Sequence, residues 1–427
     1  MRNCCVLRNE GEILDSSKNV SLRLASDMDD SKELAYADLD WAIGINRASL
    51  KIIGLWPDDK LTRRQKFLAN LRASIIFVTM FITAVIPGII ALVKVWGDIL
   101  AMTDNVQISL PFSITVTKFC LLWQRKESLV PIINMVKNDW IKTKTEQERN
   151  AMIKQAKVAR AIVIFGCVMM VIAVVLLIIF PIFGYSMRYL TNITDGDGSR
   201  PFLFQTYYLR DMSDSPYYEI IYVFQAIAIL MAAISYTGVD NFLALLVFHI
   251  CAQLDILRLR MLNLKFKNFS AAIALNIEDH LRLVRSVDVI DNAFNLMLLA
   301  LLVFFTIIFC VQGFLLVCML DGNGGDITFV RLCWLVSVTI NIFVHMCLYC
   351  VVGEILIAKG EGVYYAAYNY AWYLLKPNEA RNMLMIMIRS EKPLLITAGG
   401  MFPMTLSMFC SLIKTSAGYI SVLMANR

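Results

Sequence analysis

Charged side chains are scarce in this sequence of 427 residues. Asp, Glu, Lys and Arg together make up 17% of it, whereas a soluble domain keeps about 25%. Hydrophobic residues make up 58%, and the mean hydropathy is +0.62. The composition therefore indicates a membrane protein and argues against a string of soluble domains, which the length alone would suggest.

The motifs of catalysis and metal binding are missing too. The sequence has three histidines, far apart from one another, and its cysteines show no spacing typical of metal ligands. It contains neither a glycine-rich phosphate loop nor a nucleophile elbow. We therefore expect no enzymatic activity, no cofactor and no metal site.

An apolar stretch near the start is also lacking. The first 55 residues are mixed and polar, without the hydrophobic region of a cleavable signal peptide. We expect the first membrane span to act as its own insertion signal.

What the sequence does have is long uncharged runs. Four of them exceed the roughly 20 apolar residues that cross a bilayer as a helix. They cover residues 73–93, 161–187, 292–320 and 332–353. Three more candidates are residues 220–239, residues 105–124, weakened by Lys118, and residues 393–426, interrupted by Lys414. The sequence thus predicts an all-α membrane protein with seven transmembrane helices.

Basic residues predict the orientation of these helices. Lys and Arg concentrate in the segments 56–72, 122–160, 249–291 and 357–402, which hold 25 of them, against three in the other loops. Because cytosolic loops carry the excess of Lys and Arg, we expect a cytosolic N-terminus and an extracellular C-terminus. The sequon at Asn192 then lies outside and is a candidate glycosylation site. The same bias explains the net charge of +6, so we expect no nucleic-acid partner.

The cytosolic segments themselves have helical periodicity. Residues 38–57 predict an amphipathic helix at the inner membrane face, stopped by Pro57. The segments 125–160, 249–291 and 376–392 also predict helices, partly apolar ones. They either pack on one another within one chain or form a platform where subunits meet, and the pattern alone leaves both readings open.

These features suggest four parts. They are residues 1–72, a cytosolic segment with an interfacial helix; 73–356, transmembrane helices one to six with extended cytosolic loops; 357–402, a cytosolic helical anchor segment; and 403–427, the seventh helix.

The last helix carries a stripe of small or hydroxyl residues. At helical spacing, most of the residues on one face are small or carry a hydroxyl group: Met408, Ser411, Thr415, Gly418, Val422 and Ala425. Such a stripe serves close packing of membrane helices, or it lines a pore in which a ring of valines closes by dewetting. Pattern alone slightly favours packing.

Two charges lie within predicted spans. A charged side chain in a membrane is costly and usually has a partner. We therefore expect Asp240 and Lys414 to be structural charges rather than direct functional groups.

The end of the chain resembles a known family. The segment "ITAGGMFPMTLSMFCSLIKTSAGYISVLMANR" (396–427) resembles the C-terminal signature of insect odorant receptors, with its Thr-Ala-Gly turn and its Lys-Thr-Ser run. The segments "DNFLALLVFHICAQLDIL" (240–257) and "NRASLKIIGLWP" (46–57) look like further features of that family. The resemblance covers nearly the whole chain.

The resemblance implies a mechanism. Members are odorant-gated, non-selective cation channels of the plasma membrane in olfactory sensory neurons, with the predicted inverted orientation. They form tetramers in which an odorant-tuning subunit joins a common olfactory coreceptor. Four seventh helices surround one pore, and the gate valine falls on Val422. The implied pore residues are Ser411, Thr415, Gly418, Val422, Ala425 and Asn426.

The chain departs from the coreceptor pattern. Gly418-Tyr419 and Ala425 stand where the coreceptor and related receptors often keep a Thr-Tyr pair and a Gln, and Ala417 replaces a common aromatic residue. These departures favour a tuning subunit and leave open what it contributes to ion selectivity.

The ligand is implied to be a small, apolar odorant held among spans two to six. Side chains in the outer halves of these spans fit such a ligand, although each alone is more often plain core. The candidates are Phe112, Leu177, Pro181, Tyr222, Gln225, Ile229 and Trp334.

Two other classes compete with this reading. A seven-span receptor coupled to G proteins is disfavoured, because the chain lacks Asp-Arg-Tyr and Asn-Pro-x-x-Tyr motifs and has the opposite charge bias. A secondary transporter is disfavoured because no inverted repeat or pair of broken helices is visible.

Overall fold

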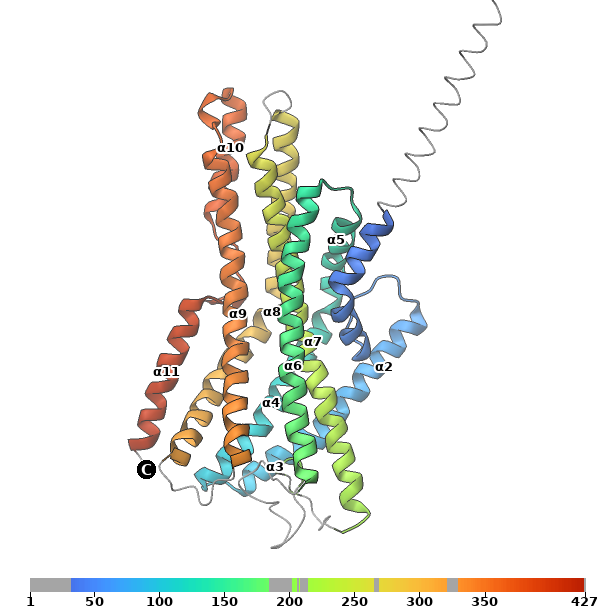
Figure 1. The fold of residues 1–427 in the computed structure, drawn as a ribbon, viewed down its shortest axis with the longest axis vertical. Helices are drawn as coiled ribbons and strands as arrows, with labels where there is room; N and C mark the ends of the chain where they lie inside the picture. Colours follow the sequence, from blue (N-terminus) through green and yellow to red (C-terminus); the bar gives the residue numbers. More distant parts are fainter. Residues whose placement is uncertain are drawn as a thin grey trace, which may run out of the picture.

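The computed structural model describes residues 32–183, 202–205, 207, 214–264, 269–320 and 329–425. The candidate residues Asn192 and Asn426 lie outside these ranges. The protein is a bundle of long helices with one short hairpin (Figure 1). We refer to its two ends as the α10 end, at the top of Figure 1, and the α3 end, at the bottom.

Five long helices make the body of the bundle. They are α4 (Ile99–Arg125), α6 (Glu146–Ile182), α7 (Tyr217–Leu262), α8 (Phe269–Leu320) and α9 (Phe329–Asn369). With 46 residues, α7 is about 69 Å long at 1.5 Å per residue, more than twice the roughly 30 Å of a hydrocarbon core. The long helices therefore project beyond a membrane, and Figure 1 shows α6 to α9 doing so toward the α10 end.

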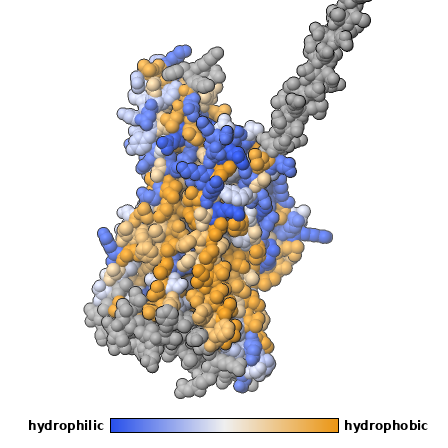
Figure 2. Space-filling model, in the orientation of Figure 1, coloured by the Kyte–Doolittle hydropathy of each residue, from blue (hydrophilic) through white to orange (hydrophobic). Residues whose placement is uncertain are grey.

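Hydropathy divides the surface along the same axis. In Figure 2 the apolar surface spreads over the middle and lower part of the visible face, and hydrophilic residues gather higher up. Helix α6 illustrates this, because only 11% of its most apolar stretch is buried and Val168 and Val171 are exposed. An apolar helix that is exposed all along one side is suited to contact with lipid.

Six helical segments in the described ranges are long and apolar enough to cross a membrane. They begin at Arg63, Ala101, Glu146, Tyr217, Phe269 and Leu332. They agree with the first six predicted spans, including the weakest one, which lies in α4. The seventh predicted span corresponds to α11 (Leu406–Ala425), which is not among these six.

The first span is interrupted. It consists of α2 (Arg63–Met80), a π-helical turn η1 (Phe81–Val85) and α3 (Ile86–Lys94). Pro87 lies just after the turn and has no backbone N–H to offer. A proline inside a helix removes one hydrogen bond and clashes with the carbonyl four residues earlier, so a local widening precedes it.

The N-terminal helix covers residues 32–52. Leu39, Ile43 and Leu50 are buried along one stripe. Beyond it, the ring of Trp56 lies tilted against the ring of Phe242 on α7, with 5.8 Å between the centroids. One face of this helix thus packs on the bundle, whereas a helix that only lies at the membrane face would not need this contact.

The predicted stop at Pro57 is wrong. The helix ends earlier, at the turn containing Gly54, whose φ of +76° suits glycine and strains other residues. A Cβ on Gly54 would also meet the backbone oxygen of Ala69 at 2.3 Å. Helix α2 then begins at a capping box, in which the Thr62 hydroxyl accepts a hydrogen bond from Gln65 N.

Shorter elements complete the α10 end. The turn η2 (Lys126–Leu129) and α5 (Val130–Ile141) follow α4, and η4 (Trp372–Leu374) and α10 (Pro377–Glu391) follow α9. Helix α10 begins at Pro377, as the sequence predicts, because proline is favoured in a first helical turn.

A short hairpin joins α10 to α11 within an otherwise helical fold. Strands β1 (Thr397–Ala398) and β2 (Phe402–Pro403) pair antiparallel, with Ala398 opposite Phe402. The predicted span over residues 393–426 is therefore helical only from Leu406. The hairpin is attached to α8, since Asp291 accepts hydrogen bonds from Thr397 N and Oγ1, at 2.6 Å and 2.9 Å.

Gly353 tests this attachment. A Cβ on Gly353 of α9 would lie 2.0 Å from the backbone oxygen of Met404, just before α11. We expect Gly353→Ala to lower the free energy of unfolding by about 1–3 kcal/mol through overpacking, which outweighs the gain of about 1 kcal/mol in helix propensity.

The measurement is thermal unfolding of the purified protein in detergent. The matched control is Gly360→Ala in the same helix, whose Cβ would meet only the Leu394 side chain at 3.5 Å. Equal unfolding temperatures for the two variants would contradict the close contact.

Candidate functional site

A cavity of about 170 Å³ lies between the five long helices. Its walls are mainly apolar and come from α4, α6, α7, α8 and α9. These are the helices of spans two to six, in which the resemblance places the ligand. The lining includes Pro111, Val174, Ala232, Phe305, Ile308 and Ile342.

Four of the seven predicted ligand residues line this cavity. They are Phe112, Leu177, Ile229 and Trp334, one each from α4, α6, α7 and α9. All four are at most 9% exposed. The ring of Phe112 also contacts Phe204 edge-on, with 5.1 Å between centroids, so the buried segment 202–205 packs against the cavity wall.

The other three predicted residues do not line it. Pro181 lies in the last turn of α6. The Tyr222 hydroxyl donates to the backbone oxygen of Ile178 at 2.6 Å, and the Gln225 side chain accepts from Leu203 N at 3.0 Å. Tyr222 and Gln225 therefore hold α7 to α6 and to the segment 202–205.

A buried ion pair lies next to the cavity. The Lys118 ammonium of α4 donates to the carboxylate of Asp240 on α7, and the Tyr349 hydroxyl of α9 donates to the same carboxylate oxygen. Lys118 is fully buried, and its ammonium lies 3.6 Å from the ring centre of Tyr236, a cavity residue. The buried Lys118 ammonium thus lies next to a residue of the apolar cavity wall.

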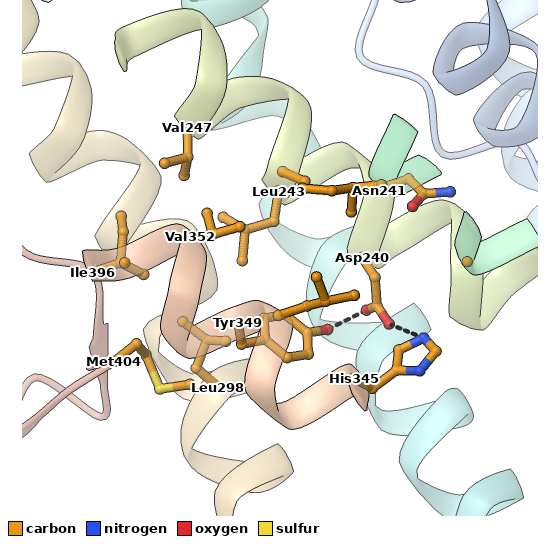
Figure 3. Close-up of a pocket in the computed structure, with 15 residues that line it drawn as sticks. Asp240, Asn241, Leu243, Val247, Leu298, His345, Tyr349, Val352, Ile396 and Met404 are labelled. Carbon is orange, nitrogen blue, oxygen red and sulfur yellow. Dashed lines mark hydrogen bonds and ion pairs between the residues drawn. The ribbon is translucent and has the colours of Figure 1, made fainter. Parts of the chain in front are cut away.

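A second, smaller cavity of about 40 Å³ is lined by Asp240 and Tyr349 of this polar cluster (Figure 3). His345 and Tyr349 approach Asp240 there, with 3.8 Å between His345 Nε2 and Asp240 Oδ2. Ile396 and Met404, which flank the hairpin before α11, line the same cavity. The ion pair therefore lies between the large cavity and the segment that leads into α11.

Helix α11 meets its own chain along one narrow face. Phe409, Leu412 and Ser416 are buried against the bundle, at the spacing of a helical stripe. Phe409 contacts Phe343 of α9 edge-on at 5.0 Å. The remaining surface of the helix is open in this single chain, and Figure 1 shows α11 at the side of the bundle.

The predicted small-residue stripe lies on the open side. Ser411, Thr415, Gly418 and Val422 are exposed, Val422 to 57%. The stripe is therefore not used for packing within this chain. Ala425 is the last residue of α11.

Hydroxyl groups of the stripe donate to the backbone of α11 itself. Ser411 Oγ donates to Ser407 O at 3.0 Å, and Thr415 Oγ1 donates to Ser411 O at 2.9 Å. Each hydroxyl oxygen then keeps a free lone pair on an exposed surface. Lys414 is exposed beside this stripe.

Sequence reasoning missed several lining residues. Gln107, Thr115, Tyr236 and Asn341 line the cavity, and Lys118 lies one turn beyond Thr115. The available signal was the spacing on α4, where the polar residues Gln107, Thr115 and Lys118 fall on one row of positions three or four residues apart that also includes position 111.

Comparisons with known proteins place this fold in a family. The long apolar helices make the chain a multi-pass membrane protein. The family described as "7tm Odorant receptor" matches residues 98–417, most of the chain. The chain therefore belongs to the odorant receptor family, a family of transmembrane receptors of olfaction and not of enzymes.

Individual relatives agree with this assignment. The chain is 26% identical to Odorant receptor 10 of Aedes albopictus over 220 residues, which are 50% of this chain and 57% of that one. It is also 26% identical to Odorant receptor 30a of Drosophila melanogaster over 336 residues, 75% of this chain and 82% of that one. The chain thus spans little more than half the length of the first relative.

A solved structure shares the fold. The olfactory receptor OR5 of Machilis hrabei in complex with eugenol superposes with a TM-score of 0.78. The match covers 91% of this chain and 100% of that one at 16% identity. A second structure of the same receptor superposes with a TM-score of 0.75.

Removing one partner of the buried ion pair tests its role in the fold. We expect Asp240→Asn to lower the free energy of unfolding by about 3–5 kcal/mol, because it leaves the Lys118 ammonium buried without a counter-charge. Thermal unfolding in detergent measures this.

Two further variants show whether the loss in Asp240→Asn comes from the unpaired buried charge. Asp40→Asn breaks an exposed pair with Arg47, and we expect it to cost at most about 1 kcal/mol. The double variant Lys118→Met with Asp240→Leu recovers most of the loss, because it removes both charges. Equal unfolding temperatures of Asp240→Asn and Asp40→Asn would contradict the role of the buried pair in the fold.

Proposed function

We propose that this chain is the odorant-tuning subunit of a ligand-gated, non-selective cation channel that acts in smell together with an olfactory coreceptor. The single observation that carries this proposal is the open stripe of α11 in a chain of the odorant receptor family. The ligand is a small apolar odorant, and the assembly is a heterotetramer embedded in lipid.

The cavity supports odorant binding. Binding sites for small ligands are clefts or cavities with mostly apolar walls and a few polar groups, and the cavity between the five long helices fits this description. The fold likeness to a receptor solved with eugenol supports a ligand of the same general class.

The stripe of α11 supports a pore. An exposed row of Ser411, Thr415, Gly418 and Val422 on a membrane helix needs either a partner helix or water. Four such helices around one axis would place hydroxyl oxygens along a water-filled path and Val422 in an apolar ring that closes it. By spacing in the sequence, Ala425 and Asn426 are the next candidates for this row.

The Lys118–Asp240 ion pair supports coupling between the proposed ligand cavity and α11. Tyr236 borders the ligand cavity, and one turn later on α7 Asp240 borders the small cavity next to Met404. Odorant binding that moves Tyr236 or Lys118 changes the packing against the hairpin, and hence the position of α11. A ligand that favours one arrangement shifts the channel toward it.

Exposed apolar residues support assembly at the α10 end. Met385 and Ile388 of α10 are 61% and 66% exposed, although Met383 and Ile386 are buried on the other side of the helix. An apolar face at a charged end of the molecule suits contacts between subunits. We propose that the anchor segment 357–402 lies in the cytosol and joins the subunits there, below the plasma membrane of the olfactory dendrite.

Co-expression tests the proposed function. We expect cells that express this chain with a coreceptor to give an odorant-evoked cation current that persists when G-protein signalling is blocked. A C-terminal tag is expected to be accessible on intact cells, and an N-terminal tag only after permeabilisation. A current that disappears with the G-protein blockade would favour the receptor without a pore.

Val422 tests the gate. We expect Val422→Ala to raise the current in the absence of odorant roughly severalfold, because a smaller side chain widens an apolar constriction. The control is Tyr419→Phe, an exposed neighbour on another face of α11 whose shape is kept. An unchanged resting current and unchanged gating in Val422→Ala would remove this residue from the gate.

A further inference from the structure

We infer that the cavity selects ligands that carry a hydrogen-bond acceptor, such as a ketone, ester or ether oxygen, on a small apolar body. This inference rests on the proposed odorant-binding function and adds the chemical class of the odorant. It comes from two side chains of the wall.

Trp334 and Gln107 border the cavity and are each 7% exposed. Within the described residues, neither the Trp334 indole N–H nor the Gln107 side-chain amide N–H₂ has a hydrogen-bond partner. Buried polar groups are nearly always paired, so two orphan groups in one wall need an explanation. A bound ligand that accepts hydrogen bonds would give both groups a partner.

Both orphan groups are donors. In the part of the wall that the structure describes, the buried side-chain atoms left without a partner are Trp334 Nε1 and Gln107 Nε2. The Thr115 hydroxyl already donates to Pro111 O at 2.7 Å. A ligand whose polar group only accepts therefore matches the wall better than one without a polar group.

The two donors also set the orientation of the ligand. Helices α4 and α9 both run from the α3 end toward the α10 end (Figure 1). Gln107 and Trp334 therefore lie near the α3 end of the cavity, two turns away from Thr115 and Asn341. The acceptor of the ligand faces the α3 end, and its apolar body faces Tyr236.

The volume limits the size of the ligand. A cavity of about 170 Å³ is close to the roughly 150 Å³ of an engineered cavity that holds benzene. The apolar lining, which includes Phe305 and Ile308, fits one ring or a short branched chain. A benzene ring with one carbonyl substituent satisfies size, polarity and orientation together.

The experiment uses pairs of volatiles of equal shape on the full chain co-expressed with a coreceptor. Acetophenone is compared with isopropylbenzene, and 2-heptanone with 2-methylheptane, as concentration–response curves of the evoked current. We expect the ketone of an active pair to act at concentrations at least about tenfold lower, because a site with hydrogen-bonding groups rejects an analogue that leaves them unpaired.

Variants separate the hydrogen bonds from shape. Trp334→Phe keeps an aromatic ring and removes the N–H, and Gln107→Leu removes the amide. Each is expected to weaken the ketone by about tenfold while leaving the hydrocarbon unchanged or stronger. The control is Trp123→Phe, whose N–H donates to Asn70 outside the cavity, and it should change neither potency.

Each result decides something. Equal potency within the pairs, or an equal loss for both members in Trp334→Phe, overturns the inference and leaves odorant binding intact. If no volatile evokes a current while a coreceptor agonist does, the proposed function fails, and the inference fails with it.

Discussion

One buried ion pair connects the parts of this receptor. Lys118 and Asp240 lie among apolar helices, where an unpaired charge is very costly, so α4 and α7 must keep the register that joins them. Tyr349 ties α9 to the same carboxylate. Because Tyr236 on one side borders the ligand cavity and Met404 on the other precedes α11, the two regions meet at a single group. A rigid polar contact between two cavities is well placed to transmit a change of shape.

The fold also leaves surfaces that a single chain does not cover. Helix α11 buries Phe409, Leu412 and Ser416 and leaves its small-residue stripe open, and α10 exposes Met385 and Ile388. These two surfaces lie at different heights of the molecule, one beside the bundle and one at its end (Figure 1). The hairpin between them is anchored to α8 by Asp291. The proposed assembly would therefore hold its subunits together at the α10 end and leave α11 outside those contacts.

The sequence predicted what depends on local pattern. Uncharged runs located the helices, and the three- and four-residue spacing placed Ser411, Thr415 and Val422 on one face of α11. The pattern slightly favoured close packing for this face, whereas the structure leaves these residues exposed. The sequence could not show what depends on distant partners. Lys118 counted against its span, because its partner lies 122 residues away. Tyr222 and Phe112 fitted an odorant site equally well by type, and only tertiary packing shows that Tyr222 instead donates to Ile178.

Under the proposed function, the apolar and the polar parts of the cavity wall contribute differently to the choice of odorant. Apolar walls contribute affinity in proportion to the area they cover, but they discriminate weakly between ligands that differ by one small group. Strong discrimination requires polar groups that a wrong ligand leaves unpaired, and here the unpaired groups are Trp334 and Gln107 at the α3 end. The ion pair lies toward the opposite end, beyond Thr115. Substitutions of Trp334 or Gln107 can thus change the polar part of the cavity wall without removing either partner of the Lys118–Asp240 pair.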